Sequence, residues 1–145
     1  MKVVIDTNVL VSGMLSEEGP PGKIVNRIME GELRVAFDSR MMAEYSRVLN
    51  RQEFALSAVV LDRLWKQMIA VGESISTSYA SLYPLPHSAD QPFLEVAVSA
   101  QVDCLITGNL KHFPPACRQD VRVLSPREFL DFYRDSQGSG FGKVK

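Results

Sequence analysis

Three acidic residues lie where an α/β protein can use a carboxylate for chemistry. Asp6 directly follows the apolar, β-forming residues 3–5, Glu44 lies on the flank of an apolar helical stripe, and Asp90 directly precedes a predicted helix. Carboxylates from separate elements suit a hard cation such as Mg²⁺, which binds oxygen ligands and keeps several waters. Chemistry of this kind depends on whether the fold brings these residues together.

Each of the three acidic residues also has a simpler explanation when it is taken alone. Asp6 and Asp90 are both placed to cap the helix that follows them. Glu44 could pair with a neighbouring arginine at the boundary of its helix. Glu95 falls on a more polar face of its helix, so we expect a solvated side chain and leave an accessory role open.

A fourth group of polar residues lies in ITGNLKHF, residues 106–113, where a predicted strand ends. Gly108 either lets the backbone come close to a ligand or simply makes the turn. We expect His112 to be a surface loop histidine and give it no catalytic role.

Strand and helix patterns alternate along the chain and predict the elements that must position these residues. Short apolar strands alternating with helices predict a mostly parallel sheet covered on both faces, with ligand chemistry at the carboxyl ends of its strands. The expected strands are KVVI (2–5), RVAFD (34–38), the weak SISTS (74–78), VDCLIT (102–107) and VRVLS (121–125). The expected helices follow GPPGK (19–23), begin at Ser39 with Asp38 or Ser39 as cap, and cover residues 57–71, 92–100 and 125–134, with a proline-broken loop at 81–90.

Length and composition fit one globular domain. The chain has 145 residues, of which 46% are hydrophobic and 23% charged, with a net charge of −1 and a pI near 6.1. The charge balance gives no global basic footprint, so a nucleic-acid contact would need locally placed arginines and lysines. Because no apolar run approaches the length of a membrane span or signal peptide, we expect a soluble, cytoplasmic protein. Cys104 and Cys117 are expected to be reduced core thiols.

The last ten residues differ in composition from the rest of the chain. SQGSGFGKVK, residues 136–145, is rich in glycine and serine and predicts a flexible tail after a domain that covers residues 1–135. We expect this tail to be ordered where another chain holds it, for example in a homo-oligomer.

Four motifs in order along the chain carry a resemblance to a known family. VVIDTNVLVS (3–12), SRMMAEYSRVL (39–49), DQPFLEVA (90–97) and LITGNLKHF (105–113) together resemble the PIN domain family over nearly the whole chain. The likeness is closest to the PIN-domain toxins of toxin–antitoxin modules, relatives of the VapC-type ribonucleases. It implies a three-layer α/β/α sandwich and an endoribonuclease that cleaves RNA, restrained by a small antitoxin.

The resemblance also implies roles for individual residues. Asp6, Glu44 and Asp90 would hold Mg²⁺, with Mn²⁺ as a substitute, and Asn109, where many members carry an aspartate, would orient a metal-bound water. The remaining polar residues expected to support the site or contact substrate are Thr7, Asn8, Arg40, Thr107 and Lys111.

The residues themselves leave alternatives open for substrate binding and for the activity. Arg40 and Lys111 could approach a phosphate backbone or be solvated surface charges, and Tyr45 could stack on a base but is expected in the core. Asn109 favours an alternative in which a metal-binding PIN module has lost catalysis and acts in interactions. An aspartyl-phosphate phosphatase ranks low, because it needs a second aspartate where the chain has Asn8.

Overall fold

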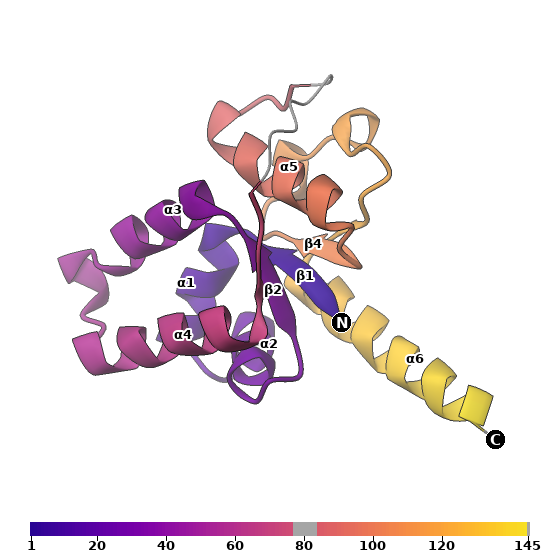
Figure 1. Ribbon diagram of the computed structural model, residues 1–145, viewed down its shortest axis with the longest axis horizontal. Coiled ribbons are helices and arrows are strands. Elements are labelled where there is room, and N and C mark those ends of the chain that lie inside the picture. Colours follow the sequence, from indigo (N-terminus) through magenta and orange to yellow (C-terminus); the bar gives the residue numbers. More distant parts are fainter. Residues whose placement is uncertain (77–83, 145) are drawn as a thin grey trace.

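The computed structural model describes residues 1–76 and 84–144, the last six of them by their backbone alone. Five strands form one parallel sheet in the order β3-β2-β1-β4-β5. They are β1 (Lys2–Ile5), β2 (Arg34–Phe37), β3 (Glu73–Ser74), β4 (Cys104–Ile106) and β5 (Val123–Leu124). Six α-helices flank the sheet: α1 (Thr7–Leu15), α2 (Pro20–Met29), α3 (Ser39–Leu49), α4 (Ala58–Val71), α5 (Gln91–Ala100) and α6 (Pro126–Val144). The predicted α/β/α fold with a mostly parallel sheet is confirmed (Figure 1).

β1 is the central strand of the sheet. Val3 pairs with Val35 of β2 on one side and with Cys104 of β4 on the other. Val3, Val4 and Ile5 are buried because neighbouring strands and helices cover both of their faces. The strand therefore delivers the next residue, Asp6, to the middle of the carboxyl edge.

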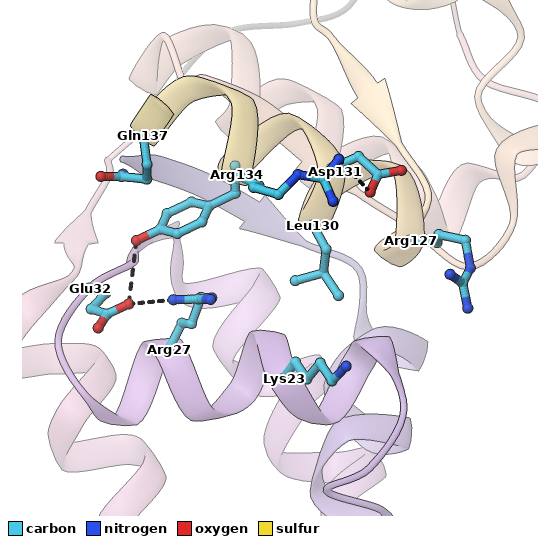
Figure 2. Close-up of a pocket in the computed structure, with 9 residues that line it drawn as sticks. Lys23, Arg27, Glu32, Arg127, Leu130, Asp131, Arg134 and Gln137 are labelled. Atoms are coloured by element: carbon cyan, nitrogen blue, oxygen red, sulfur yellow. Dashed lines mark hydrogen bonds and ion pairs between the residues drawn. The ribbon is translucent and has the colours of Figure 1, made fainter. Parts of the chain in front are cut away.

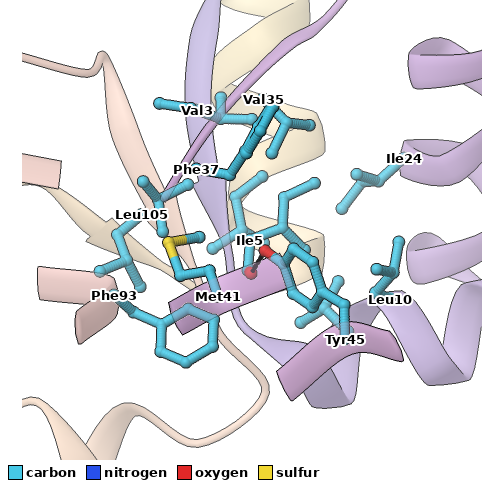
Figure 3. Packing of buried hydrophobic residues seen from close by; sticks show 14 of the residues in the cluster. Val3, Ile5, Leu10, Ile24, Val35, Phe37, Met41, Tyr45, Phe93 and Leu105 are labelled. Atoms are coloured by element: carbon cyan, nitrogen blue, oxygen red, sulfur yellow. Dashed lines mark hydrogen bonds between the residues drawn. The ribbon is translucent and has the colours of Figure 1, made fainter. Parts of the chain in front are cut away.

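Helices cover the sheet on two sides. α5 packs on β1, β2 and β4, whereas α2 packs against α1, α4 and α6. Figure 3 shows Phe93 of α5 on one side of the buried cluster, with Leu10 and Ile24 on the other. Tyr45 lies fully buried between them and donates its hydroxyl hydrogen to the Ile5 carbonyl, so its predicted place in the core is confirmed.

Local sequence signals set the starts of two helices as predicted. Asp38 caps α3 by accepting a hydrogen bond from the backbone N–H of Met41 at 2.9 Å. Ser57 caps α4 in the same way through the N–H of Val60, at 3.2 Å. α2 begins at Pro20, within GPPGK rather than after it, because proline is well suited to the first helical position.

Some predicted elements differ in extent from those in the structure. Of the weak strand expected at 74–78, only Ser74 belongs to β3, and residues 77–78 lie outside the described residues. Residues 88–90 of the expected loop form a short 3-10 turn, and residues 81–83 are not described. α6 continues to Val144 and projects from the body in Figure 1, where the sequence predicts a flexible tail from residue 136. Whether residues 136–145 are a separate tail stays a prediction.

In the described part of the chain, every helix is too short or too polar to cross a bilayer.

The two cysteines do not form a disulfide. Cys104 and Cys117 are both free thiols, and burial raises the pKa of Cys104 to about 12. Cys117 is half-buried and packs against the core, so the expected core position is confirmed for Cys104 and holds in part for Cys117.

Candidate active site

The carboxyl ends of β1 and β4 bring Asp6 and Thr107 together. The strands are parallel neighbours, and the Asp6 N–H donates to the Ile106 carbonyl at 2.9 Å. The Thr107 hydroxyl donates to Asp6 Oδ2 at 2.7 Å, and both residues are buried. Asp6 precedes α1 but makes no side-chain capping hydrogen bond, so its carboxylate is not used to cap that helix.

Asp90 is the second buried carboxylate at this edge. It is 8% exposed at the start of α5 and, like Asp6, makes no side-chain capping hydrogen bond. His112 Nδ1 lies 3.0 Å from Asp90 Oδ2. This oxygen has no other close hydrogen-bond donor among the described residues.

The loop after β4 links the surroundings of the two aspartates. The Asn109 backbone N–H donates to the Thr107 hydroxyl at 3.0 Å, and its side-chain nitrogen lies 2.8 Å from His112 Nε2. An amide nitrogen only donates, so Nε2 accepts, and neutral His112 carries its hydrogen on Nδ1, toward Asp90. Thr107, Asn109 and His112 thus form a chain of contacts from Asp6 to Asp90.

Burial and the charge of a neighbouring carboxylate raise the pKa of both aspartates. For Asp6, burial and the charge of Asp90 raise the pKa, against the lowering effects of the Thr107 and Thr7 hydrogen bonds and of His112. For Asp90, burial and the charge of Glu44 raise the pKa, whereas His112 and His87 lower it. A cation between these carboxylates would remove a repulsion that the fold itself leaves in place.

Glu44 faces its own helix more than it faces the aspartates. Its carboxylate is 30% exposed and pairs with Arg47 one turn further along α3, the arginine pairing that the sequence allowed. It nevertheless lies near enough to Asp90 to raise the pKa of that residue. No group of three acidic, histidine or cysteine residues in the described part of the chain is arranged to hold a metal ion. Convergence of Asp6, Glu44 and Asp90 on one cation therefore needs a turn of Glu44 away from Arg47.

The other expected site residues fall into two groups. Thr7 and Asn8 follow Asp6 on α1; the Thr7 hydroxyl is buried with no hydrogen-bond partner among the described residues, and Asn8 is exposed. Lys111 is exposed on the loop beyond Asn109. Arg40, by contrast, is held by two carboxylates, Asp38 and Glu95, each 2.8 Å from a guanidinium nitrogen.

The expectation that Glu95 is solvated is wrong. Glu95 is 8% exposed, and its carboxylate accepts a hydrogen bond from Arg40. Although burial lowers the pKa of Arg40, the hydrogen bonds with Glu95 and Asp38 outweigh that effect and raise it. Helix periodicity placed Glu95 on a polar face, but that face packs toward α3, where Arg40 lies.

Two histidines lie at this edge: His112, which was expected to be a surface loop histidine but is half-buried, and His87, to which the sequence assigned no role. His112 contacts both Asp90 and Asn109, and its ring lies 4.0 Å, centroid to centroid, from the ring of His87. The position of His112 three residues after Asn109 was a usable signal, because a short turn returns such a side chain toward the strand end. His87 lies within the proline-broken loop at 81–90, which has no periodicity, and nothing local marks it.

Comparison with known proteins assigns the family. The PIN domain model matches residues 2–111, which span the chain from β1 to the loop that carries Asn109 and Lys111. The chain belongs to the PIN domain family. No curated protein and no solved structure matches it. PIN domains are generally nucleases that act on nucleic acids, and they commonly use divalent metal ions.

The donors of this PIN domain fit a divalent cation. Mg²⁺ is typically held by one or two carboxylates together with substrate phosphate, and Asp6 and Asp90 supply two. The buried Thr7 hydroxyl has no hydrogen-bond partner among the described residues, and the buried Asp90 Oδ2 has only His112 Nδ1 close to it. Asp6 and Asp90 would hold the ion, and Glu44 would join them after leaving Arg47.

Proposed function

We propose that this PIN domain is a Mg²⁺-dependent endoribonuclease and the toxin of a toxin–antitoxin module. The observation that carries the proposal is the pair of buried carboxylates, Asp6 and Asp90, at the carboxyl edge of a parallel sheet. Neither caps a helix, and the charge of Asp90 raises the pKa of Asp6. Structural carboxylates of this kind are normally paired or hydrogen-bonded at every oxygen, so the arrangement favours a ligand-binding role.

The residues around the pair have separable tasks in this proposal. Thr107 orients Asp6 through its hydroxyl, and His112 holds Asp90 from the other side. Exposed Asn8 and Lys111 flank the edge and would contact phosphate oxygens of the RNA. A bound Mg²⁺, or Mn²⁺ in its place, would activate water and offset charge on the leaving oxygen.

Asp6→Asn tests the proposed chemistry directly. The substitution keeps the shape of the side chain and removes its charge, so cleavage of a labelled single-stranded RNA should fall at least about 100-fold. Asp62→Asn is the matched control, because the same change is made in an exposed residue of α4 that pairs with Lys66 at the surface. Near-normal cleavage by Asp6→Asn, with Mg²⁺ or Mn²⁺ present, would move the site elsewhere.

The toxin role needs a separate experiment in cells. Expression of the wild-type chain should arrest growth, and the Asp6→Asn variant should not. Co-expression of a small protein encoded next to this gene should also relieve the arrest by the wild-type chain. Growth arrest that persists with Asp6→Asn would show that the toxicity does not depend on RNA cleavage.

A second candidate is a PIN module that binds a partner without cleaving RNA. The observation that favours it is the Asn109 side chain, which contacts His112 and adds no carboxylate to the site. Such a module would bind Mg²⁺ and RNA yet give no product in the cleavage assay, whether the wild type is supplied with Mg²⁺ or Mn²⁺.

A further inference from the structure

A groove between α2 and α6 gathers four cationic side chains. It has a volume of about 840 Å³ and is lined by Lys23, Arg27, Glu32, Arg127, Leu130, Asp131, Tyr133, Arg134 and Gln137. Four cationic side chains face two acidic ones, in a chain whose net charge is −1. The groove therefore attracts an anionic ligand that the chain as a whole does not.

The cations at one end of the groove are free to bind such a ligand. Arg27 is engaged by Glu32 at 2.7 Å, and Arg134 lies within 4 Å of Asp131. Lys23 and Arg127 are exposed and make no ion pair with any described residue. Figure 2 shows Lys23 and Arg127 at the end of the groove opposite Glu32.

A smaller hollow is lined both by residues of the carboxyl edge and by the first turns of α2 and α6. Its volume is about 270 Å³, and it is lined by Asn8, Val9, Ser12, Pro21, Gly108, Asn109 and Pro126. Asn8 and Asn109 belong to the carboxyl edge, whereas Pro21 and Pro126 lie in the first turns of α2 and α6. Lys23 follows Pro21 by two residues and Arg127 directly follows Pro126, so both unpaired cations lie within one helical turn of residues that line this hollow.

We propose that the α2–α6 groove holds the phosphate backbone of the RNA on one side of the cleavage point, with Lys23 and Arg127 as its first contacts. This inference rests on the proposed nuclease function and extends its substrate site beyond the carboxyl edge. An acidic protein partner fits less well. A docked helix needs apolar anchor sites, but Leu130 is the aliphatic side chain in the groove lining and it is already half-buried.

The groove should bind the backbone without reading the bases. Tyr133 is 8% exposed and lies under the Arg27 guanidinium, 4.6 Å from its ring centroid, so it is not open for base stacking. Phosphate contacts position a nucleic acid and carry no sequence information. Affinity from the groove should therefore depend on strand length and salt, and be the same for different base compositions.

The test compares RNA affinity of two double variants of the full chain by fluorescence anisotropy, without divalent ions. The groove variant is Lys23→Ala with Arg127→Ala. The control variant is Arg51→Ala with Arg63→Ala, which removes the same charge from exposed residues outside the groove. The probes are single-stranded RNAs of about 4 and about 16 nucleotides, the limits of the site sizes known for single-strand-binding folds.

The groove variant should lose several-fold affinity for the long RNA, so that its preference for long over short RNA disappears. Loss of two phosphate contacts should also reduce the slope of log K against log salt by about 1.4. The control variant should keep the wild-type length preference. Equal long-RNA affinity in wild type and groove variant would overturn the proposal. Binding of polyglutamate that only the groove variant loses, with RNA affinity unchanged, would overturn it in favour of a protein partner.

The same proteins separate failure of the groove from failure of the nuclease function. If the wild type cleaves RNA with Mg²⁺ but both variants bind alike, the groove proposal fails and the function stands. If the groove variant loses long-RNA affinity but the wild type never cleaves, the groove is supported and the cleavage activity fails.

Discussion

The Asp6 carboxylate lowers the free energy of unfolding at neutral pH, at a position where the proposed function needs a carboxylate. It is buried next to Asp90, and burial raises its pKa, so the ionised side chain opposes folding at neutral pH. A site selected for folding alone would place an apolar or amide side chain there. Residues that bind ligands commonly reduce stability in this way.

Asp6→Asn should therefore raise the melting temperature of the metal-free protein while it abolishes the response to metal. Each kcal/mol of added stability raises the melting temperature of a chain of this size by about 2–4 °C. Saturating Mg²⁺, at about 100 times its Kd, should add about 2.7 kcal/mol to the stability of the wild type and nothing to the variant. Differential scanning calorimetry with and without Mg²⁺ measures both effects. A variant that melts below the wild type in EDTA would contradict the predicted cost of Asp6.

Asn109→Asp should strengthen metal binding. The amide at position 109 adds no charge to the site, and an aspartate would add one beside Asp6 and Asp90. Isothermal titration with Mn²⁺ should show tighter binding, and cleavage should need less metal than in the wild type. Unchanged affinity and stoichiometry would place Asn109 outside the metal site.

Residue types and their neighbours in sequence predicted Asp6, Asp90, Thr107 and Asn109 as candidates because each follows a strand or precedes a helix. They did not reveal His112 as a contact of Asp90, since 22 positions separate the two and the contact depends on the loop conformation. Nor did they show that Glu44 pairs with Arg47, because three arginines lay within reach along the helix.

At the scale of elements, Arg40 joins three parts of the fold. It lies on α3 and donates one hydrogen bond to Asp38, which directly follows β2, and one to Glu95 on α5. Both carboxylates are buried, and the guanidinium donates to each, whereas Asp38 also accepts a hydrogen bond from the Met41 N–H. Local signals predicted the Asp38 cap of α3, but not this link, because Glu95 is 55 residues away from Arg40.

Arg40→Ala should destabilise the protein by about 2 kcal/mol, the range for hydrogen bonds to charged groups. The loss is smaller than for a fully buried pair because 44% of the Arg40 side chain is exposed. Urea unfolding measures it, and Arg47→Ala on the same helix is the control with an exposed pair and a loss within about 0.5 kcal/mol. A stable Arg40→Ala protein with weakened RNA binding would instead support the substrate contact expected from the sequence.

At the scale of the whole molecule, the described sheet and helices form one body in which α6 is anchored near its start. Phe129 is fully buried and Tyr133 nearly so, whereas residues 134–138 are exposed. Composition predicted the change in character at residue 136, because glycine and serine cannot supply core contacts. It could not predict the helix that continues to Val144, since glycine disfavours helices locally.

Deletion of residues 136–145 should leave the melting temperature within about 1 °C of the full chain, because the buried anchors of α6 remain. Deletion from residue 129 onward is the control and should lower stability by several kcal/mol, since it removes Phe129 and Tyr133. Thermal unfolding of both proteins checks the prediction, and size-exclusion chromatography tests whether the tail holds chains together. A large loss from the shorter deletion would extend the folded domain beyond residue 135.

The central position of β1 has a consequence for the order of events during synthesis. β1 leaves the ribosome before its partner β4, which ends about one hundred residues later, at Ile106. The hydrogen bond between Thr107 and Asp6 spans 101 residues, so the nascent chain cannot complete the candidate site until Thr107 has been made. Until then Asp6 lacks the hydroxyl that orients its carboxylate, and β1 lacks its neighbour on one side.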